Sequence, residues 1–246
     1  MNNSDKLFIE ADLHCHSLAS SHAYSTVDEM AAAAVRVGIK AFALTDHAVA
    51  MPDAPHIWHF HNLPVIPQQI NGVTVLRGVE ANIMNFDGEI DMKGSDLDGI
   101  QWVVASCHAP VIKSGTIEEN TNAYINAMKS NPAIDVIGHC TAVRYPVDFE
   151  RIAKSCNEYG VFAELNESSV QFKRSSEENC IELLRACKKY ETKILVNTDC
   201  HYAGLIGKTD YSQKLIEAVN FPEKLIFNKN AENVLEYVSK KHNIIL

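Results

Sequence analysis

The sequence Asp12-Leu13-His14-Cys15-His16 holds two histidines that are two residues apart and follow an apolar stretch. Such a stretch predicts a short buried strand, in which side chains alternate between two faces. Asp12, His14 and His16 should then share one face, with Leu13 and Cys15 on the other. The Cβ atoms of the two histidines would lie roughly 6.6 Å apart, a span that two imidazoles can close on one metal ion. The pair alone is equally compatible with ordinary hydrogen bonding, so a metal site needs further ligands.

Further candidate ligands stand where other apolar stretches end. Seven short strands are predicted, at residues 7–13, 40–45, 73–79, 102–106, 135–138, 161–165 and 193–198. The candidates at or just past strand ends are His14, His16, His47, Glu80, His108, His139, Asp199 and His201. Parallel strands of a barrel deliver such residues to one rim, where catalytic groups gather. Imidazole and carboxylate ligands suit zinc, manganese or iron(II), and with His22 the set is large enough for two or three ions.

The segments between these strands carry helical patterns. Helices are predicted at residues 26–37, 116–130, 148–159, 176–190, 212–219 and 231–241. Thr26 and Glu29 form a capping-box pattern, and Gly38 is a typical residue for ending the first helix. Four prolines between residues 51 and 67 exclude a regular helix or inner strand there and predict a long loop. Alternating strands and helices predict parallel βαβ units and an α/β barrel, with an open doubly wound sheet as the alternative.

Composition narrows the class of protein. The chain has 246 residues, 46% of them hydrophobic, which predicts one globular domain over residues 1–246. Its net charge of −9 offers no basic face for nucleic acid, so no nucleic-acid partner is expected. The sequence shows neither a signal-peptide pattern nor a membrane-spanning stretch, and its seven cysteines predict reduced thiols. We therefore expect a cytoplasmic protein, and the sequence leaves open whether it forms a homo-oligomer.

The order of these motifs resembles the PHP (polymerase and histidinol phosphatase) superfamily, and its small single-domain bacterial phosphatases of the YcdX type most of all. The resemblance covers nearly the whole chain. The matching segments are Asp12-Leu13-His14-Cys15-His16, Ser21-His22-Ala23-Tyr24-Ser25, Thr45-Asp46-His47, Asp53-Ala54-Pro55-His56, Arg77-Gly78-Val79-Glu80, His108, His139 and Asp199-Cys200-His201. One departure is Cys140-Thr141, because relatives often carry proline after the histidine that corresponds to His139.

The resemblance implies a distorted (β/α)7 TIM-like barrel that holds three divalent metal ions at its C-terminal rim, usually zinc, with manganese or iron as alternatives. By similarity the first ion would be held by His14, His16, Glu80 and Asp199. Glu80 would bridge to a second ion, which His108 and His139 complete. His22, His47 and His201 would hold the third ion, and only the resemblance gives His22 this role.

Such a site favours an anionic substrate. Three divalent ions carry about six positive charges, of which Glu80 and Asp199 remove about two. Hydrolysis of phosphate monoesters is very slow without a catalyst, and several metal ions that clamp the phosphoryl oxygens suit it. The prediction is a phosphatase acting on a small phosphate monoester through a metal-bridging hydroxide, with Glu80 and Asp199 as catalytic residues. The alternatives are a phosphodiesterase or exonuclease acting on nucleic acid, and a non-catalytic metal-binding protein.

Several other residues are weaker candidates for the site. Arg144, Lys173 and Arg174 follow strands five and six and could bind phosphate, with surface solubility as the alternative. His56, His59 and His61 lie in the proline-rich loop and could contact substrate, with ordinary loop packing as the alternative. Asp12 could orient one of its neighbouring histidines. Cys15, Cys107, Cys140 and Cys200 each adjoin a candidate ligand, and strand alternation predicts that they point away from the metals.

Overall fold

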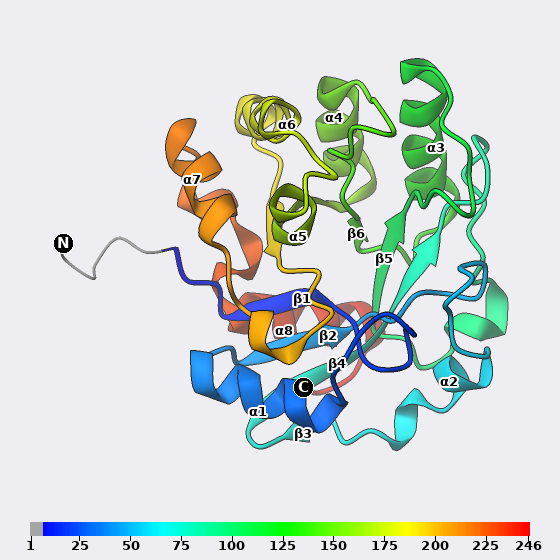
Figure 1. Ribbon diagram of the computed structural model, residues 1–246, viewed down its shortest axis with the longest axis vertical. Coiled ribbons are helices and arrows are strands. Elements are labelled where there is room, and N and C mark those ends of the chain that lie inside the picture. Colours follow the sequence, from blue (N-terminus) through cyan, green and yellow to red (C-terminus); the bar gives the residue numbers. More distant parts are fainter. Residues whose placement is uncertain (1–6) are drawn as a thin grey trace.

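Seven parallel strands form the centre of the computed structural model, which describes residues 7–246 (Figure 1). Residues 1–6, where the absence of a signal-peptide pattern was noted, lie outside the described part. The parallel strands in spatial order are β1 (Ala11–Cys15), β2 (Ala41–Leu44), β4 (Val73–Asn82), β5 (Trp102–Ser106), β6 (Val136–Ile137), β7 (Phe162–Asn166) and β8 (Ile194–Asn197). A short strand that the sequence pattern did not predict, β3 (Gln69–Ile70), pairs antiparallel with β4.

The barrel is nearly closed between its first and last strands. Cys15 and Cys200 form a parallel bridge there, and the backbone N–H of His16 donates to the carbonyl of Cys200 at 2.9 Å. The side chain of Asn197 adds a bond of 3.1 Å from the backbone N–H of Leu13. The predicted α/β barrel of seven strands is therefore confirmed, and the open sheet is not observed.

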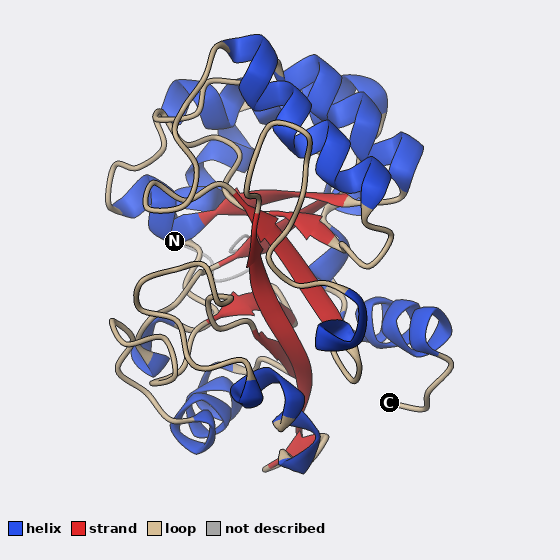
Figure 2. Ribbon diagram, turned by 90° about the vertical axis from the view of Figure 1, so that its right-hand side faces the viewer, coloured by secondary structure: helices blue, strands red, loops and turns tan. Residues whose placement is uncertain are grey.

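Helices surround the strands (Figure 2). The helices are α1 (Val27–Val37), α2 (Trp58–His61), α3 (Ile117–Ser130), α4 (Phe149–Tyr159), α5 (Glu167–Gln171), α6 (Glu177–Tyr190), α7 (Asp210–Ala218) and α8 (Ala231–His242). Short 3-10 helices occupy Leu63–Val65, Gly94–Leu97, Ala203–Leu205, Glu223–Leu225 and Phe227–Lys229. Ala231, Val234 and Val238 of α8 pack on Ala11 and Leu13 inside the barrel, so α8 covers its N-terminal end. The opposite, C-terminal end is left for the candidate ligands.

Local sequence signals account for the helix ends. The side chain of Thr26 accepts from the backbone N–H of Glu29 and the Glu29 carboxylate accepts from that of Thr26, which is a complete capping box. The same arrangement begins α3 at Thr116. Gly38 ends α1 with φ of 83°, a left-handed conformation that glycine adopts without steric cost. These caps confirm the predicted starts of α1 and α3 and the predicted end of α1.

Strand β1 corrects the prediction that Asp12, His14 and His16 share a face. Asp12 pairs with Phe42 but Cys15 pairs with Leu44, so β1 carries one extra residue between them. This bulge turns both Leu13 and His14 toward the barrel interior and leaves Asp12 facing outward. The carboxylate of Asp12 accepts from the backbone N–H groups of Thr198 and Gly207 and does not orient a histidine. Bulges commonly redirect side chains beside active sites, because the extra residue breaks strict alternation.

Smaller boundary differences have local causes. The first strand begins at Ala11 rather than at residue 7, because its ladder with β2 starts where the carbonyl of Glu10 accepts from Lys40 and Ala41. The proline-rich loop at residues 51–67 contains two short helical segments, α2 and the 3-10 helix Leu63–Val65. Among residues 7–246, no helix is long and apolar enough to span a membrane.

Candidate metal centre

Glu80 lies at the centre of the rim, near the end of β4, and its carboxylate faces histidines from four other strands. Its Oε1 atom lies 3.0 Å from Nε2 of His139 and 3.3 Å from Nε2 of both His14 and His108. Its Oε2 atom lies 2.7 Å from Nδ1 of His47. The carboxylate is fully buried. Both oxygens of this carboxylate therefore have histidine nitrogens beside them.

Asp199 supplies the second carboxylate, from the segment that follows β8. Its Oδ1 atom lies 3.2 Å from Nε2 of His16, 3.8 Å from Nε2 of His14 and 3.5 Å from Nδ1 of His201. His14, His16 and Glu80 also bring one ligand atom each within 4.8 Å of one another. The four residues predicted for a first ion, His14, His16, Glu80 and Asp199, therefore lie together.

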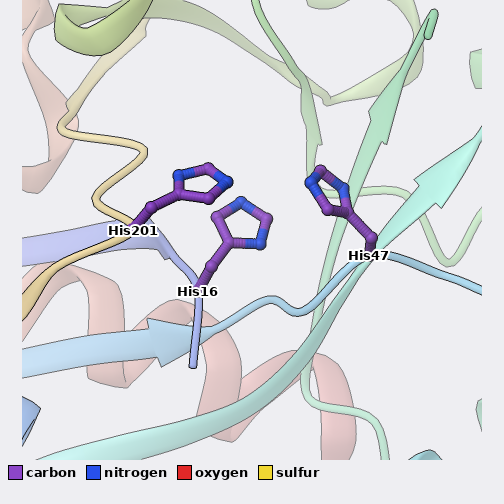
Figure 3. A group of neighbouring side chains, drawn as sticks. All are labelled: His16, His47 and His201. Atoms are coloured by element: carbon purple, nitrogen blue, oxygen red, sulfur yellow. The ribbon is translucent and has the colours of Figure 1, made fainter. Parts of the chain in front are cut away.

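A third group of imidazoles lies on the outer side of the rim. The ring centroid of His22 lies 4.4 Å from that of His201 and 5.2 Å from that of His47. Figure 3 shows His47 and His201 pointing with His16 into one space, each from a different strand end. The Nδ1 atom of His22 lies 2.7 Å from a carboxylate oxygen of Asp53, a partner that the sequence analysis did not assign. The three residues predicted for a third ion, His22, His47 and His201, are thus neighbours.

A buried carboxylate holds the loop that carries His22. Asp46 is fully buried and accepts hydrogen bonds from the backbone N–H and hydroxyl groups of both Ser17 and Ser20. The hydroxyl of Ser20 lies 3.5 Å from Nδ1 of His16 and accepts from the backbone N–H of His47. Asp46 therefore connects the loop after β1 to the loop after β2, and both loops carry candidate ligands.

The buried ligand atoms fit divalent metal ions. Among residues 7–246, several of them make no hydrogen bond although water does not reach them: Nε2 of His14, His16 and His201, Nδ1 of His47, and Oε2 of Glu80. Polar atoms left unbonded in a protein interior are costly, whereas coordination to a cation would satisfy them. Nitrogen and carboxylate donors suit zinc, manganese or iron(II).

Backbone strain coincides with two of the candidate ligands. His139 has φ of 29° and Asp199 has φ of 51°, in the left-handed region that residues with a side chain seldom adopt. Such conformations cost about 1–3 kcal/mol each and persist where surrounding contacts fix them, often at functional sites. At His139 one such contact is the bond of 2.7 Å from its backbone N–H to Glu164.

Two buried polar residues orient the ligands, and the sequence analysis missed both. Glu164 of β7 accepts from Nδ1 of His14 at 2.7 Å, and Asn82 of β4 accepts from Nδ1 of His108 at 2.7 Å. In each case the other ring nitrogen, Nε2, faces Glu80. Alternation along β4 could have indicated Asn82, because it is two residues from Glu80. Glu164 is a charged residue in an otherwise apolar predicted strand, a signal that does not identify its partner.

The surroundings shift the pKa values of both carboxylates strongly. Burial acts to raise the pKa of Glu80, but the charges of His108, His14 and His47 outweigh it and hold the pKa well below its ordinary range. Burial likewise acts against ionised Asp199, and His14 and His16 hold its pKa well below the usual value. Both groups are therefore anionic at neutral pH, the state that binds a cation.

The two histidines of β1 are shifted in opposite directions. Burial and the nearby His47 and His201 lower the pKa of His16 to about 3. Burial also disfavours charged His14, yet Glu164 and Glu80 raise its pKa well above the ordinary value. His16 is therefore neutral and ready to coordinate at pH 7, whereas a metal must displace a proton from His14.

A cavity of about 260 Å³ opens over these ligands. Its lining includes the candidate ligands His22, His47, Glu80, His108, His139, Asp199 and His201, together with Met51, Cys107, Ala109, Ala142, Arg144, Tyr145, Ser169 and Arg174. Arg144 and Arg174 thus reach the cavity, whereas Lys173 is exposed and does not line it.

Two histidines of the proline-rich loop, His59 and His61, pair with acidic residues that are not candidate metal ligands. Nε2 of His59 lies 3.3 Å from Asp46, and Nε2 of His61 lies 3.1 Å from Asp96. Neither these two nor His56 lines the cavity, and none of the three belongs to a group of neighbouring candidate ligand atoms among residues 7–246.

The cysteines beside the candidate ligands pack in the apolar layer, as alternation predicts, although Cys107 also borders the cavity. Cys15, Cys107, Cys140 and Cys200 belong to the apolar cluster between the barrel and its helices. Burial raises the pKa of Cys107 to about 12 and the pKa values of Cys15 and Cys140 well above the ordinary range. Cys15, Cys107 and Cys140 are therefore protonated at neutral pH, and the candidate ligands at the rim are imidazoles and carboxylates.

Comparison with known proteins places the chain in a family. A probable phosphatase of Acetivibrio thermocellus is 44% identical over 230 residues, 94% of this chain and 95% of that protein. A probable phosphatase of Caldicellulosiruptor saccharolyticus is 42% identical over 232 residues, 94% and 97% of the two chains. Histidinol phosphate phosphatase from Lactococcus lactis, in complex with zinc, L-histidinol and phosphate, shares the fold with a TM-score of 0.63 at 17% identity, covering 87% of this chain and 94% of that one. The PHP domain pattern matches residues 12–168, and the chain therefore belongs to the PHP domain family.

Proposed function

We propose that the protein hydrolyses a small phosphate monoester with the help of divalent metal ions. One observation carries the proposal: nine imidazole and carboxylate side chains gather at one rim, and several of their buried ligand atoms have no hydrogen-bond partner among residues 7–246. Family membership, and relatives named probable phosphatases over nearly the full length, make the chain an enzyme of the phosphatase class. The substrate and the number of ions belong to the proposal.

Three groups of residues would hold the ions. His14, His16, Glu80 and Asp199 would hold the first. Glu80 would also serve the second, with His108 and His139, and its central place among five histidines supports this sharing. His22, His47 and His201 would hold the third, which their ring contacts support. Zinc is favoured because a structurally similar phosphatase was crystallised with it, and manganese or iron would suit the same donors.

Divalent ions held by these residues would supply Lewis-acid chemistry toward phosphoryl oxygens and would lower the pKa of a bound water. The chain's own contribution is positioning. Glu80 and Asp199 keep their charge at neutral pH and hold the ligands around them. Glu164 and Asn82 fix which nitrogen of His14 and His108 faces the site.

The cavity supports a small substrate. Its volume of about 260 Å³ lies at the low end for ligand pockets, which suits a compact ester better than a nucleic-acid strand.

Arg174, 3.0 Å from Asp199, stands at the edge of the ligand group and could contact a phosphoryl oxygen. The free state of all seven cysteines fits the predicted cytoplasmic location.

Turnover of p-nitrophenyl phosphate tests the proposal. The purified protein should hydrolyse this ester, lose the activity with its metal after chelation, and regain it when zinc or manganese is restored. Metal analysis of the active sample should find close to three ions per chain. Degradation of single-stranded DNA at a comparable rate would favour the exonuclease alternative. A fully metallated sample that hydrolyses no phosphate ester would favour the non-catalytic metal-binding alternative.

A further inference from the structure

Two arginines line the cavity together with the candidate ligands, and they belong to two loops that pair with each other. Arg144 belongs to the loop after β6, and Arg174 to the loop after α5. The backbone N–H of Val143 donates to the carbonyl of Arg174 at 2.9 Å, and Ala142 and Ser175 form an antiparallel bridge. The two loops are thus paired, and their guanidinium groups reach one cavity from neighbouring positions.

The two guanidinium groups differ in how their charge is compensated. Arg174 donates to Oδ2 of Asp199 at 3.0 Å and to the hydroxyl of Ser168 at 2.8 Å. Arg144 is in contact with the phenol of Tyr145, a neutral group whose hydroxyl donates to the carbonyl of Ile112. Within the described range 7–246, no carboxylate lies within 4.0 Å of the Arg144 guanidinium, in contrast to Arg174.

The different pairing of their charges gives Arg174 and Arg144 different roles in the cavity. A phosphate group at the metal ligands would meet the positive charge of the ions and of Arg174, which stands beside Asp199. Arg144 is exposed and also lines the cavity, so it is left as a second positive group that an anion bound there can meet. Its planar guanidinium presents paired N–H donors, a geometry that matches a carboxylate or a phosphate.

We propose that Arg144 selects phosphate esters whose leaving group carries a second anion, a carboxylate or another phosphate. The proposal rests on the phosphatase function proposed above and names its substrate class. Arg144 would act as a specificity-determining residue that binds the part of the substrate not being hydrolysed.

Matched substrate pairs test this proposal. 3-Phosphoglycerate and glycerol 3-phosphate share a backbone and an ester, and differ in a carboxylate. Fructose 1,6-bisphosphate and fructose 6-phosphate differ in a second phosphate. The metal-loaded protein should give kcat/KM values about 10-fold or more higher for the doubly anionic member of at least one pair, the size expected of a charge-assisted hydrogen bond. The pair with the larger ratio identifies the second anion as carboxylate or phosphate.

Substitutions of Arg144 test whether this residue causes the preference for the doubly anionic ester. Arg144→Gln should reduce the ratio of kcat/KM values within the preferred pair to near one, mainly through KM, and Arg144→Lys should keep part of it. Arg151→Gln is the matched control, because Arg151 is paired with Glu118 outside the cavity, and it should keep the full ratio. A wild-type protein without preference in either pair, or an Arg144→Gln variant with an unchanged ratio, overturns the proposal. Absence of p-nitrophenyl phosphate turnover would instead refute the phosphatase function itself.

Discussion

Oε1 of Glu164 lies 2.7 Å from Nδ1 of His14, and both side chains are fully buried. The opposite nitrogen of the same ring, Nε2, faces Glu80 at 3.3 Å. A carboxylate at Nδ1 keeps a proton on that nitrogen, directs the Nε2 lone pair toward the metal and makes the ring a stronger ligand. Glu164 also accepts from the backbone N–H of His139 and from the side chain of Asn197, so it fixes two ligand-bearing strands.

We expect Glu164→Gln to lower the affinity for metal by about 10-fold or more, the usual effect of removing a carboxylate that orients a metal-bound histidine. Glutamine keeps the shape of the side chain but loses the charge that polarises His14. Competition between the protein and a chromogenic chelator for zinc measures the affinity directly, without reference to turnover.

Glu167→Gln provides a control for this prediction. Glu167 is also buried, but it accepts from the backbone N–H groups of Tyr211 and Ser212 at the start of α7 and touches no candidate ligand. This variant should unfold more easily while its affinity for zinc stays unchanged. An equal loss of zinc affinity in both variants would show that Glu164 acts through general stability.

Replacement of Glu80 tests the centre of the site. Glu80→Ala should abolish turnover of p-nitrophenyl phosphate and lower the metal content, because it removes the one carboxylate shared among the histidines of four other strands. Glu89→Ala, at an exposed glutamate that pairs with Lys93, is the control and should change neither quantity. A Glu80→Ala protein of undiminished rate would contradict the proposed arrangement of ions.

The ligands were predictable from sequence because parallel strands impose a common geometry. A chemically active side chain that follows one apolar stretch is weak evidence, but when six of seven stretches end in this way the rim of a barrel must bring the side chains together. Helix ends were predictable for a similar reason, since Thr26, Glu29 and Gly38 act through contacts within a few residues. The helix caps could be predicted because their contacts are local, and the ligands because the same pattern repeats at successive strand ends.

The bulge in β1 was not predictable from the same signals. Strict alternation places Asp12 with His14, whereas the extra residue opposite Ala43 separates them. Whether a strand carries an extra residue depends on its register with a neighbour, which apolar periodicity does not specify. The roles of Asp12 and Glu164 likewise depend on partners 186 and 150 residues away, at Thr198 and His14.

The group around His22 should release its metal first. The His22 side chain is 50% exposed, whereas those of His14 and His16 are fully buried, so water and chelator reach this group most easily. We expect one ion per chain to leave before the others during treatment with a chelator. Asp53→Asn should speed this first loss by about 10-fold, because the Asp53 carboxylate holds Nδ1 of His22 at 2.7 Å.

The pair formed by His61 and Asp96 provides a matched control, since it has a similar separation of 3.1 Å but lies outside the site. Asp96→Asn should leave the time course of metal loss unchanged. Metal analysis of samples withdrawn at intervals measures that time course. Simultaneous loss of all ions in both the wild type and Asp53→Asn would contradict a separate third site.

Because the pKa of His14 is raised, the stability of the protein and its affinity for metal should both depend on pH. Burial disfavours the charged ring, but Glu164, Glu80 and Asp199 together raise the pKa well above its ordinary value of 6.5. The stabilisation from the protonated ring is complete below 6.5 and is lost as pH rises through the folded-state pKa. A divalent ion at Nε2 replaces this proton, so metal binding should strengthen over the same rise in pH.

As the pH rises from about 6.5 through the raised pKa of His14, the metal-free protein should therefore lose free energy of unfolding, and the zinc-loaded protein should lose less. Urea unfolding at a series of pH values measures both trends. Zinc binding at pH 7 should release about one proton more from the wild type than from His14→Gln, as read by calorimetry in buffers of different ionisation enthalpy. His16, with its pKa of about 3, carries no proton at this pH, so His14 is the histidine of β1 from which zinc displaces a proton. Equal proton release from the wild type and His14→Gln would show that the displaced proton does not come from His14.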